Sequence, residues 1–120
     1  LIKHFPEIKY AYNYSVTSDG TFYFLGYAEG VGSMNDFGIY RMELNNGEYT
    51  KPELLPANIN MGDGLLNWTP FIAPDESYLL FASNRLNPKT DMGDIYISFR
   101  GAFPGYFRYS LLLTGSRKEL

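Results

Sequence analysis

The feature that most constrains how this chain can fold is an ordered pattern of short apolar segments that occurs twice. Asp75 follows Asp19 by 75 − 19 = 56 residues, and Tyr96 follows Tyr40 by 96 − 40 = 56 residues. Apolar runs fall at matching places between these anchors, although few of the aligned residues are identical. Two anchors at one spacing indicate an internal repeat, so we expect two copies of one structural unit.

Each copy contains four segments with the character of β-strands. They are short, they end at turn sequences such as residues 17–20 (TSDG) and 45–47 (NNG), and 18% of the chain is aromatic. Aromatic residues favour strands, and no window sustains the apolar period of a helix. We predict strands at residues 10–16, 21–27, 37–44 and 48–55 of a first unit (1–56) and at 68–73, 77–83, 94–99 and 106–113 of a second (57–120).

The second strand of each unit is apolar on both of its faces. At the spacing of 56, Phe24 aligns with Leu80 and Leu25 with Phe81, and neither strand alternates apolar with polar residues. A sandwich leaves one face of each sheet in water and favours alternation, whereas a propeller blade is covered on both faces by its neighbours. We therefore expect an all-β fold of two four-stranded antiparallel propeller blades. A small sandwich or barrel with unusually apolar second strands is the alternative.

Composition and charge exclude several other classes. The net charge of −3 argues against a nucleic-acid-binding protein, because such proteins carry a basic surface. No apolar run approaches the roughly 18 residues of a membrane-spanning helix, so we do not expect a transmembrane protein. The absence of cysteine excludes disulfides and thiolate metal sites. The chain begins at Leu1 without a charged and apolar leader, which we interpret as a mature or trimmed product.

Residues 71–85, FIAPDESYLLFASNR, resemble the TolB-type propeller repeat. That repeat runs apolar-x-Ser/Ala-Pro-Asp-Gly-x-apolar-apolar-apolar-Phe-x-Ser-x-Arg, and its next strand commonly opens Asp-Ile-Tyr, found here at residues 94–96. The first unit is a looser copy, with SDG at residues 18–20 and GIY at 38–40 but without the Ser-x-Arg ending. The resemblance covers about residues 10–100, and residues 103–111 depart from the pattern of the fourth strand.

This resemblance implies a propeller, usually of six blades, in a protein exported to the periplasm or cell surface. Members often act as binding platforms, so it implies a non-enzymatic interaction module with a protein or saccharide ligand. The alternative is a fragment of a larger propeller-containing enzyme, either a peptidase or a carbohydrate-active enzyme.

Two blades cannot close a ring, and each would therefore leave one large apolar face exposed. We therefore expect self-association through the exposed blade faces; three two-blade chains would supply six blades. The chain could instead be a piece of a longer protein, or its two sheets could fold face to face as a compact sandwich.

The residues show no catalytic constellation, and we expect neither an enzyme nor a bound metal or cofactor. The single histidine, His4, lies near the chain terminus and has no evident nucleophile beside it. Asp19 and Asp75 could form a carboxylate pair, but each opens a turn in which its side chain can cap backbone N–H groups. Four aspartates could in principle bind a hard cation through oxygen, although their spacing fits no known Ca²⁺ loop: Asp36, Asp63, Asp91 and Asp94.

Three polar loops are the candidate binding surface. In a four-stranded blade, the loop between the second and third strands and the loop between blades open on the same rim, and rigidly held polar loops often carry function. These loops are residues 28–36, 56–67 and 84–91. An arginine at the end of a second strand can alternatively bond neighbouring loop carbonyls. The candidate rim residues are Glu29, Asn35, Asp36, Asn58, Asn60, Asp63, Asn84, Arg85, Asn87, Lys89 and Asp91.

Overall fold

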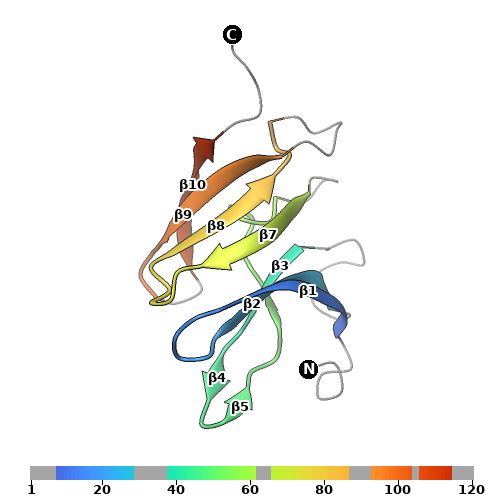
Figure 1. Ribbon diagram of the computed structural model, residues 1–120, viewed down its shortest axis with the longest axis vertical. Helices are drawn as coiled ribbons and strands as arrows, with labels where there is room; N and C mark the ends of the chain where they lie inside the picture. The colour runs from blue at the N-terminus through green and yellow to red at the C-terminus, as the bar shows by residue number, and fades with distance from the viewer. Residues whose placement is uncertain (1–7, 29–37, 62–65, 87–92, 104–105, 115–120) are drawn as a thin grey trace.

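The computed structural model describes residues 8–28, 38–61, 66–86, 93–103 and 106–114 (Figure 1). Within those ranges the chain forms antiparallel strands and no helix, which confirms the expected all-β class. Two four-stranded sheets dominate, and in each of them the strands follow one another in chain order. The principal extents are 51 × 30 × 21 Å.

Sheet 1 consists of four strands in the order β1-β2-β3-β6. Its inner strand β2 is apolar on both faces, as the sequence predicts, and it lies between β1 and β3. The bounds are β1 (Ile8–Val16), β2 (Phe22–Ala28), β3 (Gly38–Met42) and β6 (Glu53–Leu54).

Sheet 2 has the order β7-β8-β9-β10, so that β8 occupies the place that β2 has in sheet 1. The strands begin and end within two residues of the predicted ranges. They are β7 (Asn67–Ile72), β8 (Tyr78–Ser83), β9 (Asp94–Arg100) and β10 (Phe107–Thr114).

Residues 48–55 do not form the single strand that we expected. Their first part, β5 (Glu48–Tyr49), pairs with β4 (Leu44–Asn45) in a separate hairpin, and only β6 pairs with β3. The turn residues Asn46 and Gly47 both have positive φ, which suits the tight turn of a two-residue hairpin. Pro52 then separates the hairpin from β6, because proline has no N–H to donate to a ladder.

The first strand of each sheet has the same irregularity at the same place. β1 is bulged between Tyr12 and Ser15, and β7 is bulged between Trp68 and Phe71. Asn13 (φ 57°) and Thr69 (φ 56°) lie within these bulges and are 69 − 13 = 56 residues apart. A bulge is a specific feature of a strand, and both first strands have one at the same repeat position. The repeat therefore extends to the local backbone conformation.

The second strands are related by 57 residues and not by the 56 expected from the sequence. Phe24 pairs with Tyr40 in sheet 1, and Phe81 pairs with Tyr96 in sheet 2. Phe24 therefore corresponds to Phe81 (81 − 24 = 57) and not to Leu80, while Tyr40 and Tyr96 keep the spacing of 56. The rings of both pairs are stacked, with centroids 5.5 and 5.8 Å apart.

The extra residue lies in the turn between β7 and β8. Thr17 N–H donates to the carbonyl of Thr21 in the first unit, whereas Ala73 N–H donates to the carbonyl of Tyr78 in the second, one position further along. Ser77 is the added residue. Because side chains alternate along a strand, this single insertion exchanges the two faces of β8 relative to a simple alignment.

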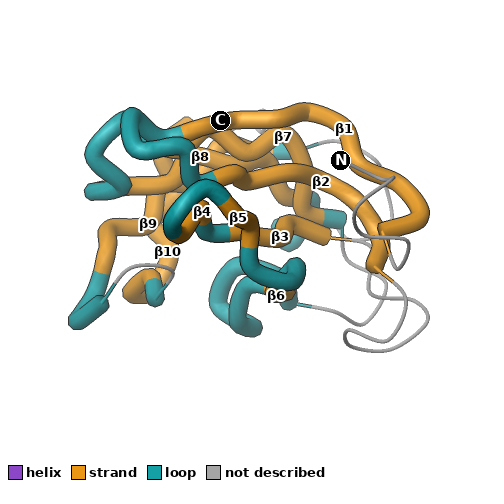
Figure 2. Tube along the Cα trace, turned by 90° about the horizontal axis from the view of Figure 1, so that it is seen from below, coloured by secondary structure: helices purple, strands orange, loops and turns teal. Residues whose placement is uncertain are grey.

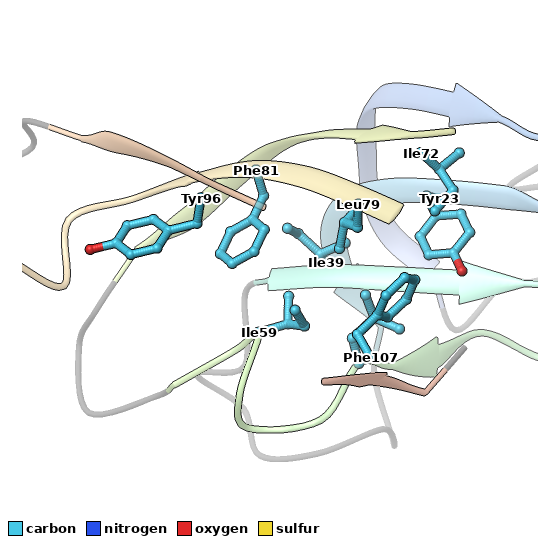
Figure 3. Packing of buried hydrophobic residues seen from close by; sticks show 9 residues of the cluster. Tyr23, Ile39, Ile59, Ile72, Leu79, Phe81, Tyr96 and Phe107 are labelled. Atoms are coloured by element: carbon cyan, nitrogen blue, oxygen red, sulfur yellow. The ribbon is translucent and has the colours of Figure 1, made fainter. Parts of the chain in front are cut away.

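The two sheets pack against each other through one shared apolar core (Figure 3). Sheet 1 contributes Tyr23 and Ile39 from β2 and β3, and the segments around β6 add Leu55 and Ile59. Figure 2 shows β1 and β2 passing close to β7, as the residue contacts between these strands require. Sheet 2 contributes Ile72, Leu79, Phe81, Tyr96 and Phe107.

The packing joins unlike faces of the two units. Phe24 and Tyr40 lie on the face of sheet 1 that points away from sheet 2, in a second cluster with Ile8 and Met42. Their counterparts Phe81 and Tyr96 lie on the face of sheet 2 that points toward sheet 1. The contact is therefore head to tail, and the operation that carries unit 1 onto unit 2 would place a third unit on the far side of sheet 2.

Candidate binding surfaces of the two sheets

Four of the predicted rim residues belong to the described part of the chain, and they lie at the predicted loops. Asn58 and Asn60 lie in the segment between β6 and β7, while Asn84 and Arg85 follow β8. The remaining candidates, together with His4, lie outside the described residues: Glu29, Asn35, Asp36, Asp63, Asn87, Lys89 and Asp91.

The three asparagines of this group hold loop backbone in place. Asn60 Nδ2 donates to the carbonyls of Ile39 and Leu55, at 3.0 Å each, and Asn60 Oδ1 accepts the N–H of Ile39 at 2.9 Å. Asn84 Oδ1 accepts the N–H of Leu66 at 2.7 Å. Asn58 Nδ2 donates to two carbonyls at the start of β10. These amides therefore give the rim a rigid base.

Arg85 connects this base to the core. Its guanidinium donates to the carbonyls of Asn58 and Ile59 at 3.3 and 2.9 Å, and to Asn67 Oδ1 at 3.0 Å. It also lies over the stacked rings of Phe81 and Tyr96, with its central carbon 5.1 and 4.6 Å from their centroids. Burial lowers the pKa of Arg85. Loop carbonyls are the partners that the sequence predicted for this arginine as the alternative to a ligand contact.

A buried polar cluster joins the two sheets and was not anticipated from the sequence. Glu76 Oε2 in the β7–β8 turn accepts hydrogen bonds from Tyr23 Oη at 2.6 Å and from Arg41 Nε at 2.7 Å. Both Arg41 and Glu76 are buried. Burial raises the pKa of Tyr23, and the bond to the Glu76 carboxylate raises it further. Burial acts to lower the pKa of Arg41, but its bonds to Glu76 and Tyr23 raise it overall.

Two serines extend this polar contact along the sheets. Ser15 Oγ accepts the N–H of Ile72 at 2.8 Å, and Ser18 donates to the carbonyl of Pro74 from its N–H at 2.8 Å and its hydroxyl at 3.0 Å. Sheet 1 thus meets sheet 2 with four polar residues, Ser15, Ser18, Tyr23 and Arg41.

The outer face of sheet 2, opposite the shared core, is apolar and accessible to solvent. Cross-strand pairing places Leu80 beside Phe71 and Ile97, Tyr78 beside Phe99, and Leu111 beside Ile97. Directly paired residues point to the same side of a sheet, so these side chains form one surface. Phe71 (49%), Phe99 (45%), Leu111 (44%) and Ile95 (36%) are the most exposed of them. We call this surface the outer face; it comprises Phe71, Tyr78, Leu80, Ile95, Ile97, Phe99 and Leu111.

The outer face is the repeat counterpart of the face by which sheet 1 contacts sheet 2. At each of the four polar positions of sheet 1, however, sheet 2 has a residue that cannot donate a hydrogen bond from its side chain. Ser15 and Ser18 correspond to Phe71 and Pro74 at a spacing of 56. Tyr23 corresponds to Leu80 at 57, and Arg41 to Ile97 at 56. The same geometrical face therefore carries four polar residues and is covered in one unit, whereas it is apolar and exposed in the other.

The turn aspartates each accept hydrogen bonds within their own turn. Asp19 accepts from Thr17 Oγ1 at 2.5 Å and from Thr21 N–H at 3.3 Å, and these bonds lower its pKa. Asp75 accepts the N–H of Ser77 at 3.0 Å, and its bonds to Ser77 lower its pKa likewise. Within the described ranges, no three acidic or histidine residues are placed to hold a metal ion.

Comparison with known protein families, curated proteins and solved structures finds no match to this chain. In the parts of the chain that the structure describes, there is also no helix long and apolar enough to cross a membrane.

Proposed function

We propose that the two sheets are consecutive blades of a propeller built from TolB-like repeats, which serves as a non-enzymatic interaction module outside the cytoplasm. The proposal is supported by the head-to-tail contact of the sheets, which is the relation between successive blades. The resemblance of residues 71–85 to that repeat supports it independently.

The observation that carries the proposal is the outer face of sheet 2. Its counterpart on sheet 1 is covered by a four-stranded sheet, and an apolar surface of this kind marks a contact with another protein surface. The occupant that fits is a third sheet of the same repeat, presenting the equivalents of Phe81 and Tyr96. Such a sheet would cover β8 on both of its faces, as β2 is already covered in sheet 1.

The chemistry of the outer face specifies this third sheet further. Because Leu80 and Ile97 replace Tyr23 and Arg41, the outer face has no cation to pair with a buried carboxylate. A carboxylate placed there in the manner of Glu76 would be desolvated without a partner, at a cost of several kcal/mol. We therefore expect the third sheet to carry an uncharged residue in its corresponding turn.

The loop rim is then the surface available for a protein or saccharide ligand. Asn58, Asn60, Asn84 and Arg85 hydrogen-bond loop backbone next to the sheets, and a rigid base of this kind favours a binding role for the polar residues of the rim.

The test is to make the outer face polar without touching the core. We expect wild-type chain to bind the hydrophobic dye 8-anilinonaphthalene-1-sulfonate, and the double variant Ile95→Lys/Phe99→Lys to lose most of this fluorescence while keeping its far-ultraviolet circular dichroism. The matched control is Tyr10→Lys/Tyr12→Lys, which adds the same charge at exposed residues of β1. Equal dye binding by both double variants would contradict an exposed docking surface on sheet 2.

A structure of the longest natural polypeptide that contains this sequence tests the propeller itself. The proposal expects at least one more four-stranded sheet on the outer face of sheet 2. A face covered by a helix or by an unrelated sheet would reject it.

A further inference from the structure

We propose that the free edge of β10 is a strand-pairing site for the β10 strand of a second copy of this chain, joining two sheets into one across a two-fold axis. The proposal concerns the edge of sheet 2 rather than its outer face, and it does not depend on the propeller. Among the residues that the structure describes, β10 pairs with β9 on one side and is the last strand of sheet 2 on the other (Figure 1).

The outermost edge strands of the two sheets differ in length and in sequence. In sheet 1 the edge strand β6 is two residues long, follows Lys51 and Pro52, and includes Glu53. Short length, charge and proline are the features by which proteins prevent an edge from pairing with another chain. β10 is eight residues long, contains no proline, and has Arg108 as its sole charged residue. The edge of sheet 2 therefore lacks the protection that its counterpart has.

The first half of β10 is already engaged within the chain. Asn58 Nδ2 donates to the carbonyls of Phe107 and Arg108 at 2.6 Å each, and Ser110 Oγ donates to the carbonyl of Asn58 at 3.0 Å. Ser98 Oγ also donates to the carbonyl of Arg108. Arg108, the sole charged residue of β10, thus lies in the half of the strand that is hydrogen-bonded by Asn58 and Ser98.

The second half of β10 is apolar and exposed. Leu111, Leu112 and Leu113 have 44%, 47% and 51% of their surfaces in solvent. Three consecutive leucines on an edge point to both sides of the sheet, so one covering sheet cannot bury them all. An added strand can, because it contacts the side chains on both sides and also hydrogen-bonds the free backbone.

The occupant is a second copy because this segment is self-complementary. Residues 110–114 read Ser-Leu-Leu-Leu-Thr, which has nearly the same chemistry in both directions. An antiparallel pair centred on Leu112 places leucine opposite leucine and Ser110 opposite Thr114 of the other copy. In this register the two Arg108 side chains lie far apart along the pair and do not face each other.

The experiment exploits the absence of cysteine from the chain. In Leu112→Cys, pairing places the two introduced thiols directly opposite each other, with Cα atoms about 4.5–5.5 Å apart, within the range of a disulfide. In the control Tyr109→Cys, the two thiols would be about 20 Å apart along the paired strands. Tyr109 is more exposed than Leu112, at 71% against 47%, so random collision would favour the control. Diamide oxidises two thiols to one disulfide, and the rate of covalent dimer formation is the readout.

We expect Leu112→Cys to form the covalent dimer faster than Tyr109→Cys by on the order of tenfold or more, because pairing raises the effective concentration of the thiols. Equal rates, or a faster reaction of Tyr109→Cys, would overturn the proposal.

Sedimentation equilibrium gives a second, independent measurement. The wild-type chain is expected to sediment as a dimer, Leu112→Lys as a monomer, and Phe99→Lys, which alters the outer face but not the edge, as a dimer. A wild-type chain that is monomeric at the highest soluble concentration would overturn the edge pairing. So would dissociation by Phe99→Lys with Leu112→Lys unaffected; that result would instead place the dimer contact on the outer face.

Discussion

Sheet 1 and sheet 2 are copies of one unit that present the same face to very different surroundings. In sheet 1 this face carries Tyr23 and Arg41, is covered by sheet 2, and is fixed there by the Glu76 carboxylate. In sheet 2 the corresponding Leu80 and Ile97 face solvent at least in part. The comparison shows that one backbone geometry can carry a covered face with buried polar groups or an exposed apolar face, depending on the side chains at four positions.

The largest effect is expected from removing the Glu76 carboxylate. Glu76→Ala removes the buried carboxylate 2.7 Å from Arg41 Nε and leaves the more exposed Glu43, 3.2 Å from Arg41 Nη2, as the remaining carboxylate partner. We therefore expect the free energy of unfolding to fall by about 3 kcal/mol. Urea denaturation at neutral pH measures this change. A loss below about 1 kcal/mol would show that the cluster does not hold the sheets together.

A transplant between the two units sharpens this prediction. The triple variant Tyr23→Leu/Arg41→Ile/Glu76→Gly gives sheet 1 the apolar residues of the outer face. It also gives the β7–β8 turn the glycine that the first unit has at Gly20. Because replacing a buried ion pair by apolar groups is often close to neutral, we expect it to recover most of the stability lost in Glu76→Ala. A triple variant as unstable as the single one would contradict the expectation that apolar packing can replace the polar cluster.

The next prediction compares the stability lost when a phenylalanine is truncated on each of the two faces of sheet 2. Phe81 is buried in the shared core and Phe99 lies on the outer face. We expect Phe81→Ala to cost about 3–5 kcal/mol and Phe99→Ala about 0.5 kcal/mol. Thermal unfolding of both variants checks this order; similar costs would mean that both faces are covered in solution.

A smaller effect is expected at the shared bulge. Thr69 is β-branched and has φ 56°, a conformation that asparagine tolerates better, and the first unit has Asn13 there. Thr69→Asn should therefore stabilise the chain by about 0.5–1 kcal/mol, while the reciprocal Asn13→Thr should destabilise it similarly. Effects of the same sign in both variants would show that the two bulges are not equivalent.

The smallest effect concerns the turn aspartates. The pKa of Asp19 is lowered below 3.8 by its bonds to Thr17 and Thr21, and that of Asp75 by its bonds to Ser77. A lowered pKa in the folded state means that the ionised form stabilises the fold above pH 3.8 and that this contribution disappears as pH falls through the folded-state value. Asp19→Ala and Asp75→Ala should each lower the urea midpoint slightly at neutral pH and hardly at all near pH 2. A deficit that persists unchanged at low pH would assign the effect to lost packing.

Much of the fold could be predicted from the sequence because strands are specified locally. Apolar segments of suitable length between turn residues identified the core strands of both sheets, and the loop asparagines lie where the pattern placed them. The turn at residues 45–47 is predicted by the sequence, but the separation of the β4–β5 hairpin from sheet 1 is not, because residues 48–55 have the propensity of one strand in spite of Pro52.

The register of β8 and the buried cluster around Glu76 could not be predicted from local sequence patterns. One added residue, Ser77, shifts the equivalence from Leu80 to Phe81, and an ungapped alignment conceals such a change. Glu76 has φ 66° at a turn position where the TolB-type repeat has glycine. A buried glutamate that tolerates this backbone strain marks a specific contact, so the departure from glycine was the available signal. Its partners Tyr23 and Arg41 are distant in sequence and could be identified only in the fold.

The central claim is that the sheets pack head to tail, with the face of Tyr23 meeting the face of Leu79 and Phe81. Nuclear Overhauser effects between side-chain protons test it most directly, since the Tyr23 and Phe107 ring centroids are 6.1 Å apart. The account predicts cross-peaks from Tyr23 to Phe107 and Leu79, together with ring contacts within the pairs Phe24–Tyr40 and Phe81–Tyr96. Cross-peaks from Tyr23 to Leu80 or Ile97 instead would place the outer face of sheet 2 in the contact and contradict it.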